Sequence, residues 1–132
     1  MPSTSQLTTG QYFERKAEAL LKQQGLSTID RNYRSRYGEI DLIMRDKNTL
    51  VFVEVRYRKH QQFGSASASV TPNKQKKIIL TAEYYLQQHR WTESYNCRFD
   101  VVSISPDTNK ANEAEAFLIE WIKDAFSVSH HS

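Results

Sequence analysis

The stretch from Gly38 to Lys59 reads GEIDLIMRDKNTLVFVEVRYRK. Two runs rich in Ile, Val and Phe flank a polar segment at residues 46–49, and this pattern predicts an antiparallel β-hairpin. A turn at Lys47–Asn48 and a longer turn over residues 46–49 give the same register. In that register Asp41 faces Glu54, and Glu39 faces Arg56.

The predicted register gives the hairpin two unlike faces. One face is apolar and is expected to lie on the core, with the pairs Ile40–Val55, Leu42–Val53 and Met44–Val51. The other face carries Ile43 opposite Phe52, followed by the charged pairs. Directly opposed residues have Cβ atoms about 4.5–5.5 Å apart, and like charges there are destabilising.

Two carboxylates at this separation either share a proton or hold a divalent cation, whose charge reverses their repulsion. We favour the cation because basic residues surround Asp41 and Glu54. The alternative is a pair of solvated acids on an open sheet face.

Composition describes one domain of ordinary size: 132 residues, 39% hydrophobic and 25% charged. Cys97 is the only cysteine, which excludes an internal disulfide and fits a reducing, cytoplasmic location. The N-terminus has neither the basic start nor the apolar run of a signal peptide. No apolar stretch is long enough to span a membrane, so we expect no membrane association.

The charge is unevenly distributed along the chain. Residues 31–77 hold eleven Lys or Arg against four acids, whereas residues 78–132 hold four basic and eight acidic residues. A basic surface with acids at its centre suits a polyanion that is both bound and acted upon, such as nucleic acid. A basic surface that serves only solubility is the alternative.

Several further elements are predicted around the hairpin. Helical periodicity over Gly10–Gln24, closed by Gly25, indicates a first helix that carries Glu14 and Glu18 one turn apart. For such acids the default is solvent, although one of them could face the sheet. Further predictions are a strand at 26–36, a mobile loop at 61–70, a helix from Pro72 to about Arg90 with Thr71 as N-cap, and a strand at 97–105. Residues 113–126 fit either a helix or a short buried strand.

Basic residues near the hairpin are candidates for contacts to phosphates, with plain surface charge as the alternative. Lys74 and Lys77 lie in the first turns of the second helix, where the helix dipole disfavours cations and an external anion would relieve the mismatch. We expect Asp100 to be structural or paired with Arg98. The full candidate set is Arg34, Arg36, Arg58, Lys59, Lys74 and Lys77.

The order of elements, with an acid, then Asp, then Glu-x-basic, resembles the core of the PD-(D/E)xK, or restriction-endonuclease-like, superfamily. More closely, the motifs FERKAE, NYR, GEIDLI, FVEVRYR, NKQKK, RFDVVSI and IKDAF resemble the bacterial UPF0102, or YraN, family. Its members are regarded as candidate endonucleases similar to archaeal Holliday junction resolvases. The resemblance covers the chain from about Gly10 to Phe126.

The resemblance implies an α/β fold: a restriction-endonuclease-like core of helix, three strands, helix and strand, with a mixed central sheet flanked by helices. Residues 10–126 would form a single nuclease-like domain between a flexible N-terminus at 1–9 and a flexible tail at 127–132. The final segment would become a short strand plus a helical turn. Resolvases of this type usually act as dimers, so a homodimer is a further expectation.

The resemblance also implies a chemistry. Mg²⁺ or Mn²⁺ would be held by Asp41, Glu54 and Glu14, with the main-chain carbonyl of Val55. Arg56 stands where the superfamily usually has Lys; it would stabilise developing negative charge, and Glu39 would orient it. The expected function is metal-dependent hydrolysis of phosphodiesters in structured or branched DNA. The alternatives are a non-catalytic nucleic-acid-binding domain with the same fold and a protein-interaction module.

Overall fold

The computed structural model describes residues 7–59, 70–89, 96–107 and 116–127. Its elements, in chain order, are α1 (Thr9–Gln23), β1 (Ser27–Ser35), β2 (Gly38–Asp46), β3 (Thr49–Tyr57), α2 (Pro72–His89), β4 (Asn96–Pro106) and β5 (Phe117–Phe126). Most of the flexible ends expected at 1–9 and 127–132, and most of the loop expected at 61–70, lie outside the described residues; of the expected N-terminal end, Thr9 already belongs to α1.

The five strands form one mixed sheet in the order β1-β2-β3-β4-β5. Strands β3 and β4 are parallel, and the other neighbours are antiparallel. A parallel pair needs a long crossover connection, and the segment containing α2 supplies it. The architecture is therefore α/β, as expected, and is consistent with a restriction-endonuclease-like core.

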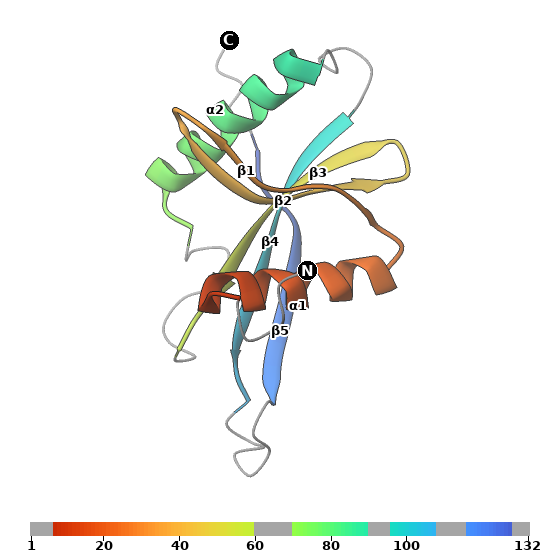
Figure 1. The fold of residues 1–132 in the computed structure, drawn as a ribbon, viewed down its shortest axis with the longest axis vertical. Helices are drawn as coiled ribbons and strands as arrows, with labels where there is room; N and C mark the ends of the chain where they lie inside the picture. The colour runs from red at the N-terminus through yellow and green to blue at the C-terminus, as the bar shows by residue number, and fades with distance from the viewer. Residues whose placement is uncertain (1–6, 60–69, 90–95, 108–115, 128–132) are drawn as a thin grey trace.

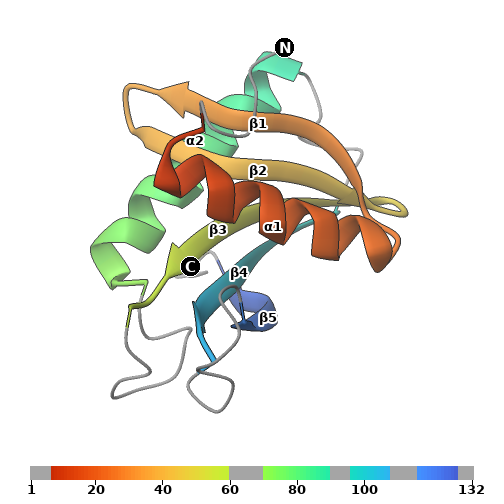
Figure 2. The ribbon, with the colours of Figure 1, turned by 60° about the horizontal axis from the view of Figure 1, so that its bottom comes forward.

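The two helices cover opposite faces of the sheet (Figure 1, Figure 2). On one face α1 buries Phe13, Ala17 and Leu21, spaced four residues apart, against a cluster that includes Val53 and Val102. On the other face α2 packs Ile78, Ala82 and Tyr85 against a second cluster. Both faces of the hairpin are thus covered, which does not fit the alternative of two solvated acids on an open sheet face.

The helix boundaries follow from their caps. Thr8 and Gln11 form a capping box, so α1 begins one residue earlier than expected. Gly25 follows α1 with a positive φ of 98°, as its sequence position predicted. At α2, the Thr71 hydroxyl accepts a hydrogen bond from the Lys74 amide at 3.2 Å, which confirms the predicted N-cap.

The last element, β5, is a strand over Phe117–Phe126 with one irregularity, a positive φ of 51° at Asp124, so the helical turn expected at its end is wrong. Its strand form comes from pairing with the free edge of β4. Buried Asp100 joins the two strands, because it accepts hydrogen bonds from Trp121 Nε1 and from the Asp124 amide, both at 2.9 Å. Asp100 also pairs with Arg98 at 3.0 Å, which confirms its expected structural role.

Strands β2 and β3 pair in the predicted register only between their turn and the pair Leu42–Val53. Beyond that pair β2 remains with β1 as far as Gly38, whereas β3 continues alongside β4 to Tyr57. Figure 1 shows β1 and β2 turning together toward α2 while β3 leaves in another direction. The two strands of the hairpin therefore separate at Asp41.

Because β2 and β3 separate, the side chains that share a face of the hairpin differ from the predicted ones. Ile40 packs in the α2-side cluster with Ile43, whereas Leu42 and Met44 pack on the α1 side. Residues 40 and 42 of a regular strand would share a face, so the alternation is interrupted between them. The prediction that Ile40 lies with Leu42 and Met44 is wrong, because a period of two applies only while the strand stays regular.

Among the residues described, neither helix is both long and apolar enough to cross a membrane.

Candidate functional site

Asp41 lies where β2 leaves β3. Its carboxylate oxygen Oδ2 accepts a hydrogen bond from the Val55 amide of β3 at 2.8 Å. A side chain thus occupies a backbone donor at the point where strand pairing ends. The structure places Val55 at the site through its amide; a role for its carbonyl remains a prediction.

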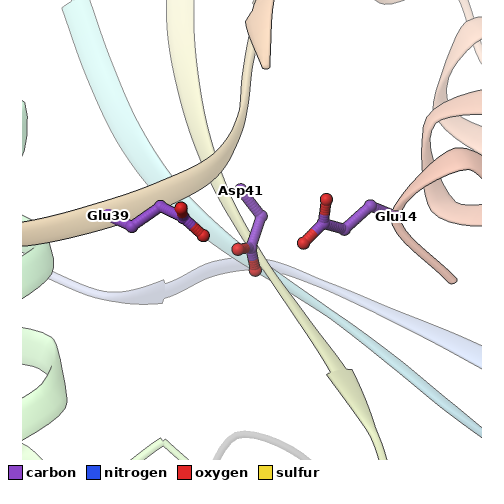
Figure 3. A group of neighbouring side chains, drawn as sticks. All are labelled: Glu14, Glu39 and Asp41. Carbon is purple, nitrogen blue, oxygen red and sulfur yellow. The ribbon is translucent and has the colours of Figure 1, made fainter. Parts of the chain in front are cut away.

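Three carboxylates converge at this point. Each of Glu14, Glu39 and Asp41 offers an oxygen atom, and these atoms lie within 4.8 Å of one another. Figure 3 shows the side chains pointing together, with Asp41 between Glu39 of the same strand and Glu14 of α1. All three are only half-buried, so solvent and solutes reach them.

Asn32 positions Glu14. This residue of β1 has a positive φ of 52°, between the paired residues Arg31–Leu42 and Tyr33–Ile40. Asn is among the residues that tolerate this conformation, which costs most others about 1–2 kcal/mol. Its Nδ2 donates a hydrogen bond to Glu14 Oε1 at 2.8 Å. Asn32 was not a predicted site residue; its place in the NYR motif was the only signal.

Burial and mutual repulsion raise the pKa values of carboxylates in the cluster. Burial raises the pKa of Glu14 to about 7, with the charges of Asp41 and Glu39 adding to it and the Asn32 hydrogen bond opposing it. Burial and then the neighbouring Glu54 charge raise the pKa of Asp41 to about 7. These groups hold protons that acids on an open surface would have lost at neutral pH.

Glu54 adjoins Asp41 from β3, and its side chain is only 5% exposed. Burial raises its pKa, while the charges of Lys74 and Arg56 oppose the rise. Lys74 Nζ and Arg56 Nη1 each stand 3.8 Å from Glu54 Oε2, which is beyond ordinary hydrogen-bonding distance. The predicted proximity of Asp41 and Glu54 is present, but it arises where the ladder has ended.

Glu39 does not orient Arg56 in the way its predicted pairing required. Glu39 lies opposite Arg34 of β1, and Arg34 Nε is 2.6 Å from Glu39 Oε2. The reason is the separation of the strands, which leaves Arg56 paired with β4. The Nε atom of Arg56 is buried and has no hydrogen-bond partner among the described residues.

The six basic candidates belong to three segments. Arg34 lies near the end of β1 and Arg36 in the β1–β2 turn, Arg58 and Lys59 follow β3, and Lys74 and Lys77 lie in the first turns of α2. These segments and the beginning of α1 lie along one side of the molecule, on the left in Figure 2. Direct contact joins two of them, because Ser35 Oγ donates to Thr81 Oγ1 at 3.2 Å.

The donor set fits a hard divalent cation. Carboxylate oxygens are the ligands that Mg²⁺ and Mn²⁺ prefer. Two oxygens bound to one Mg²⁺ lie about 2.9 Å apart in neighbouring positions and about 4.2 Å apart in opposite ones, so a cation would draw the three oxygens closer together. A cation would also compensate the repulsion that raises these pKa values. Glu18, by contrast, is committed to Arg31, whose Nη2 lies 2.7 Å from its carboxylate.

Comparison with known sequences decides the family. The model of "Uncharacterised protein family UPF0102" matches residues 13–104. The chain belongs to the UPF0102 family. UPF0102 proteins similar to it include one from Alcanivorax borkumensis, 45% identical over 122 residues, or 92% of this chain and 94% of that protein. Another, from Methylobacillus flagellatus, is 51% identical over 114 residues, or 86% of this chain and 92% of that protein.

The part of the chain matched by the UPF0102 model contains the whole candidate site. Its residues 13–104 run from the helix that carries Glu14 to most of β4, and include all six basic candidates. Strand β5 lies beyond the match. The sequence signature of UPF0102 therefore coincides with the part of the fold that assembles the acids.

Proposed function

We propose that the protein is a metal-dependent nuclease that hydrolyses phosphodiester bonds in nucleic acid, with structured or branched DNA as the expected substrate. The observation that carries this proposal is the convergence of Glu14, Glu39 and Asp41 within 4.8 Å. Burial and the charges of neighbouring carboxylates raise the pKa values of Glu14 and Asp41, and a cation between them would compensate that repulsion. The basic residues on the surrounding segments supply the complementary charge for a polyanion.

Each residue has a role in the proposed mechanism. Asp41, Glu14 and Glu39 would hold the cation, and Glu54 would be a further oxygen donor beside them. Held there, Mg²⁺ or Mn²⁺ would supply Lewis acidity to a phosphoryl oxygen and to a water molecule. Arg56, whose Nε atom has no partner, stabilises negative charge that develops on the phosphate. Contacts to flanking phosphates come from Arg34, Arg36, Arg58, Lys59, Lys74 and Lys77.

Replacement of Asp41 tests the proposal directly. We expect Asp41→Asn to lose Mn²⁺ binding by calorimetry and to cut four-way junction, flap and linear DNA at least about 100-fold more slowly than the wild type. Glu120→Gln is the matched control, since Glu120 is an exposed acid of β5 outside the cluster. Metal-dependent cleavage that survives undiminished in Asp41→Asn would exclude the assignment.

One observation favours a second function, nucleic-acid binding without cleavage. Arg56 follows Glu54 at the position where the resembling superfamily usually has Lys. Arg stays protonated, whereas Lys can lose its proton when buried and assist in activating water. This alternative predicts salt-sensitive DNA binding and no cleavage with Mn²⁺.

A further inference from the structure

A small pocket lies between the β1–β2 turn and α2, beside the candidate site. Its volume is about 150 Å³, and it is lined by Tyr37, Leu80, Glu83, Tyr84 and Gln87. Pockets for drug-sized ligands usually measure about 300–1,000 Å³. The pocket therefore suits a single planar ring system.

Two tyrosine rings form the aromatic part of this pocket. Tyr37 and Tyr84 have ring centroids 6.4 Å apart and planes inclined by 65°. Tyr84 is 38% exposed, so part of its ring is accessible from solvent. A flat ring packed into the open angle beside them would stack on one tyrosine and meet the edge of the other.

The charge around the pocket indicates what carries that ring. Arg36 lies over the Tyr37 ring, 5.0 Å from its centroid, and donates a hydrogen bond to the Tyr37 hydroxyl at 2.9 Å. Lys77 of α2 lies close to Gly38, the first residue of β2. A Cβ atom added at Gly38 would be 3.6 Å from the Lys77 Cβ atom. Cations around an aromatic pocket fit a base attached to a phosphate backbone better than an uncharged aromatic molecule.

The pocket is also close to the proposed chemistry. Tyr37 precedes Glu39 by two residues, which is roughly 7 Å of extended chain. We infer that this pocket receives an unpaired nucleobase, and that the substrate is nucleic acid with an unpaired base next to the bond that is cut. The inference rests on the proposed function and narrows its substrate class.

The polar lining predicts which bases are preferred. The oxygens of a carboxylate side chain such as Glu83 accept hydrogen bonds, so they favour a base with an exocyclic amino group. The Gln87 amide can both donate and accept. Cytosine or adenine should therefore bind better than thymine, which has no amino group.

The test compares a DNA duplex that carries one unpaired cytosine with the fully paired duplex, in EDTA so that nothing is cut. We expect the wild type to prefer the unpaired-base duplex by about fivefold to 100-fold, the range for stacking one base. Tyr84→Leu should lose this preference, whereas Tyr84→Phe keeps the ring and should retain it. Gln88→Ala, an exposed residue of α2 outside the pocket lining, should leave the preference unchanged.

A second variant guards against a folding defect in Tyr84→Leu. Glu83→Gln removes only the charge of an exposed residue and should reduce the preference for unpaired cytosine over unpaired thymine. An equal affinity of the wild type for both duplexes, or a preference that persists in Tyr84→Leu, would overturn the inference. Metal-dependent cleavage by that same wild type would leave the proposed function standing, and absence of both binding and cleavage would end it.

Discussion

Glu39 can pair either with Arg34 or with a cation held by the acidic cluster. Its carboxylate converges with Glu14 and Asp41, yet it also lies 2.6 Å from the guanidinium of Arg34. The Arg34 side chain is 79% exposed, so the ion pair is weak and can exchange. Arg34 can therefore release Glu39 to a cation when it turns to a phosphate.

Replacement of Arg34 should change two affinities in opposite directions. We expect Arg34→Gln to raise Mn²⁺ affinity by up to about fivefold, the value of an exposed ion pair, and to weaken DNA binding. Calorimetry with Mn²⁺ and a DNA titration in EDTA measure the two effects. Arg36→Gln is the control on the same turn; it should weaken DNA binding with a smaller change in Mn²⁺ affinity. Unchanged or lower Mn²⁺ affinity in Arg34→Gln would contradict this view of Glu39.

At the scale of elements, the separation of β2 from β3 makes the site. Regular pairing would bury backbone groups against each other and leave no gap for Asp41 to contact Val55. On the β1 side, Asn32 adopts its positive φ beside this point and reaches Glu14. One irregular position in β1 thus supports both the path of the strand and an acid on α1.

Two replacements of Asn32 separate these contributions. Asn32→Ala should lower the free energy of unfolding by about 1–3 kcal/mol, because Ala is strained at positive φ and the hydrogen bond to Glu14 is lost. Asn32→Gly should cost less, since Gly adopts this φ freely. Both should weaken Mn²⁺ binding to a similar extent. Urea denaturation measures the stability and calorimetry measures the Mn²⁺ binding. Equal destabilisation by Ala and Gly would show that the positive φ of Asn32 does not contribute to the loss of stability.

At the scale of the whole molecule, the acidic cluster links stability to pH. In the native state the pKa values of Glu14 and Asp41 are about 7, well above those of acids in an unfolded chain, near 4. Between these values the native state binds more protons than the unfolded state. The cluster therefore stabilises the fold fully below about pH 4, and this contribution is lost as pH rises toward about 7.

Thermal melts in EDTA should show that the stabilising contribution of the cluster falls as pH rises. We expect the difference in Tm between Asp41→Asn and the wild type to grow in favour of the variant from pH 5 to pH 8. Mn²⁺ should raise the Tm of the wild type more at pH 8 than at pH 5.5, because the cation must displace protons from the acids. A Tm difference between variant and wild type that does not change with pH would mean that Asp41 does not titrate in this range.

Local interactions allowed the sequence to determine much of the architecture. Thr71 and Gly25 mark helix boundaries because a cap acts on the backbone within a few residues of itself. The turn at residues 47–48 sets the hairpin register as far as the pair Leu42–Val53, and Asp41 and Glu54 are the next residues beyond that pair. The concentration of basic residues around the acids is likewise a property of the sequence.

Other features depend on contacts between residues distant in the chain. Residues 117–126 have apolar residues at helical spacing but form β5, because the edge of β4 offers backbone partners that the segment itself does not have. Because the strands separate, Ile40 packs on the α2 side, and Glu39 forms an ion pair with Arg34 and does not lie opposite Arg56. Hairpin periodicity cannot predict this, because β2 follows β1 and β3 follows β4. The sequence determined which acids are available. Only the tertiary structure, in which β2 and β3 diverge and both helices pack on the sheet, decided which of these acids come together.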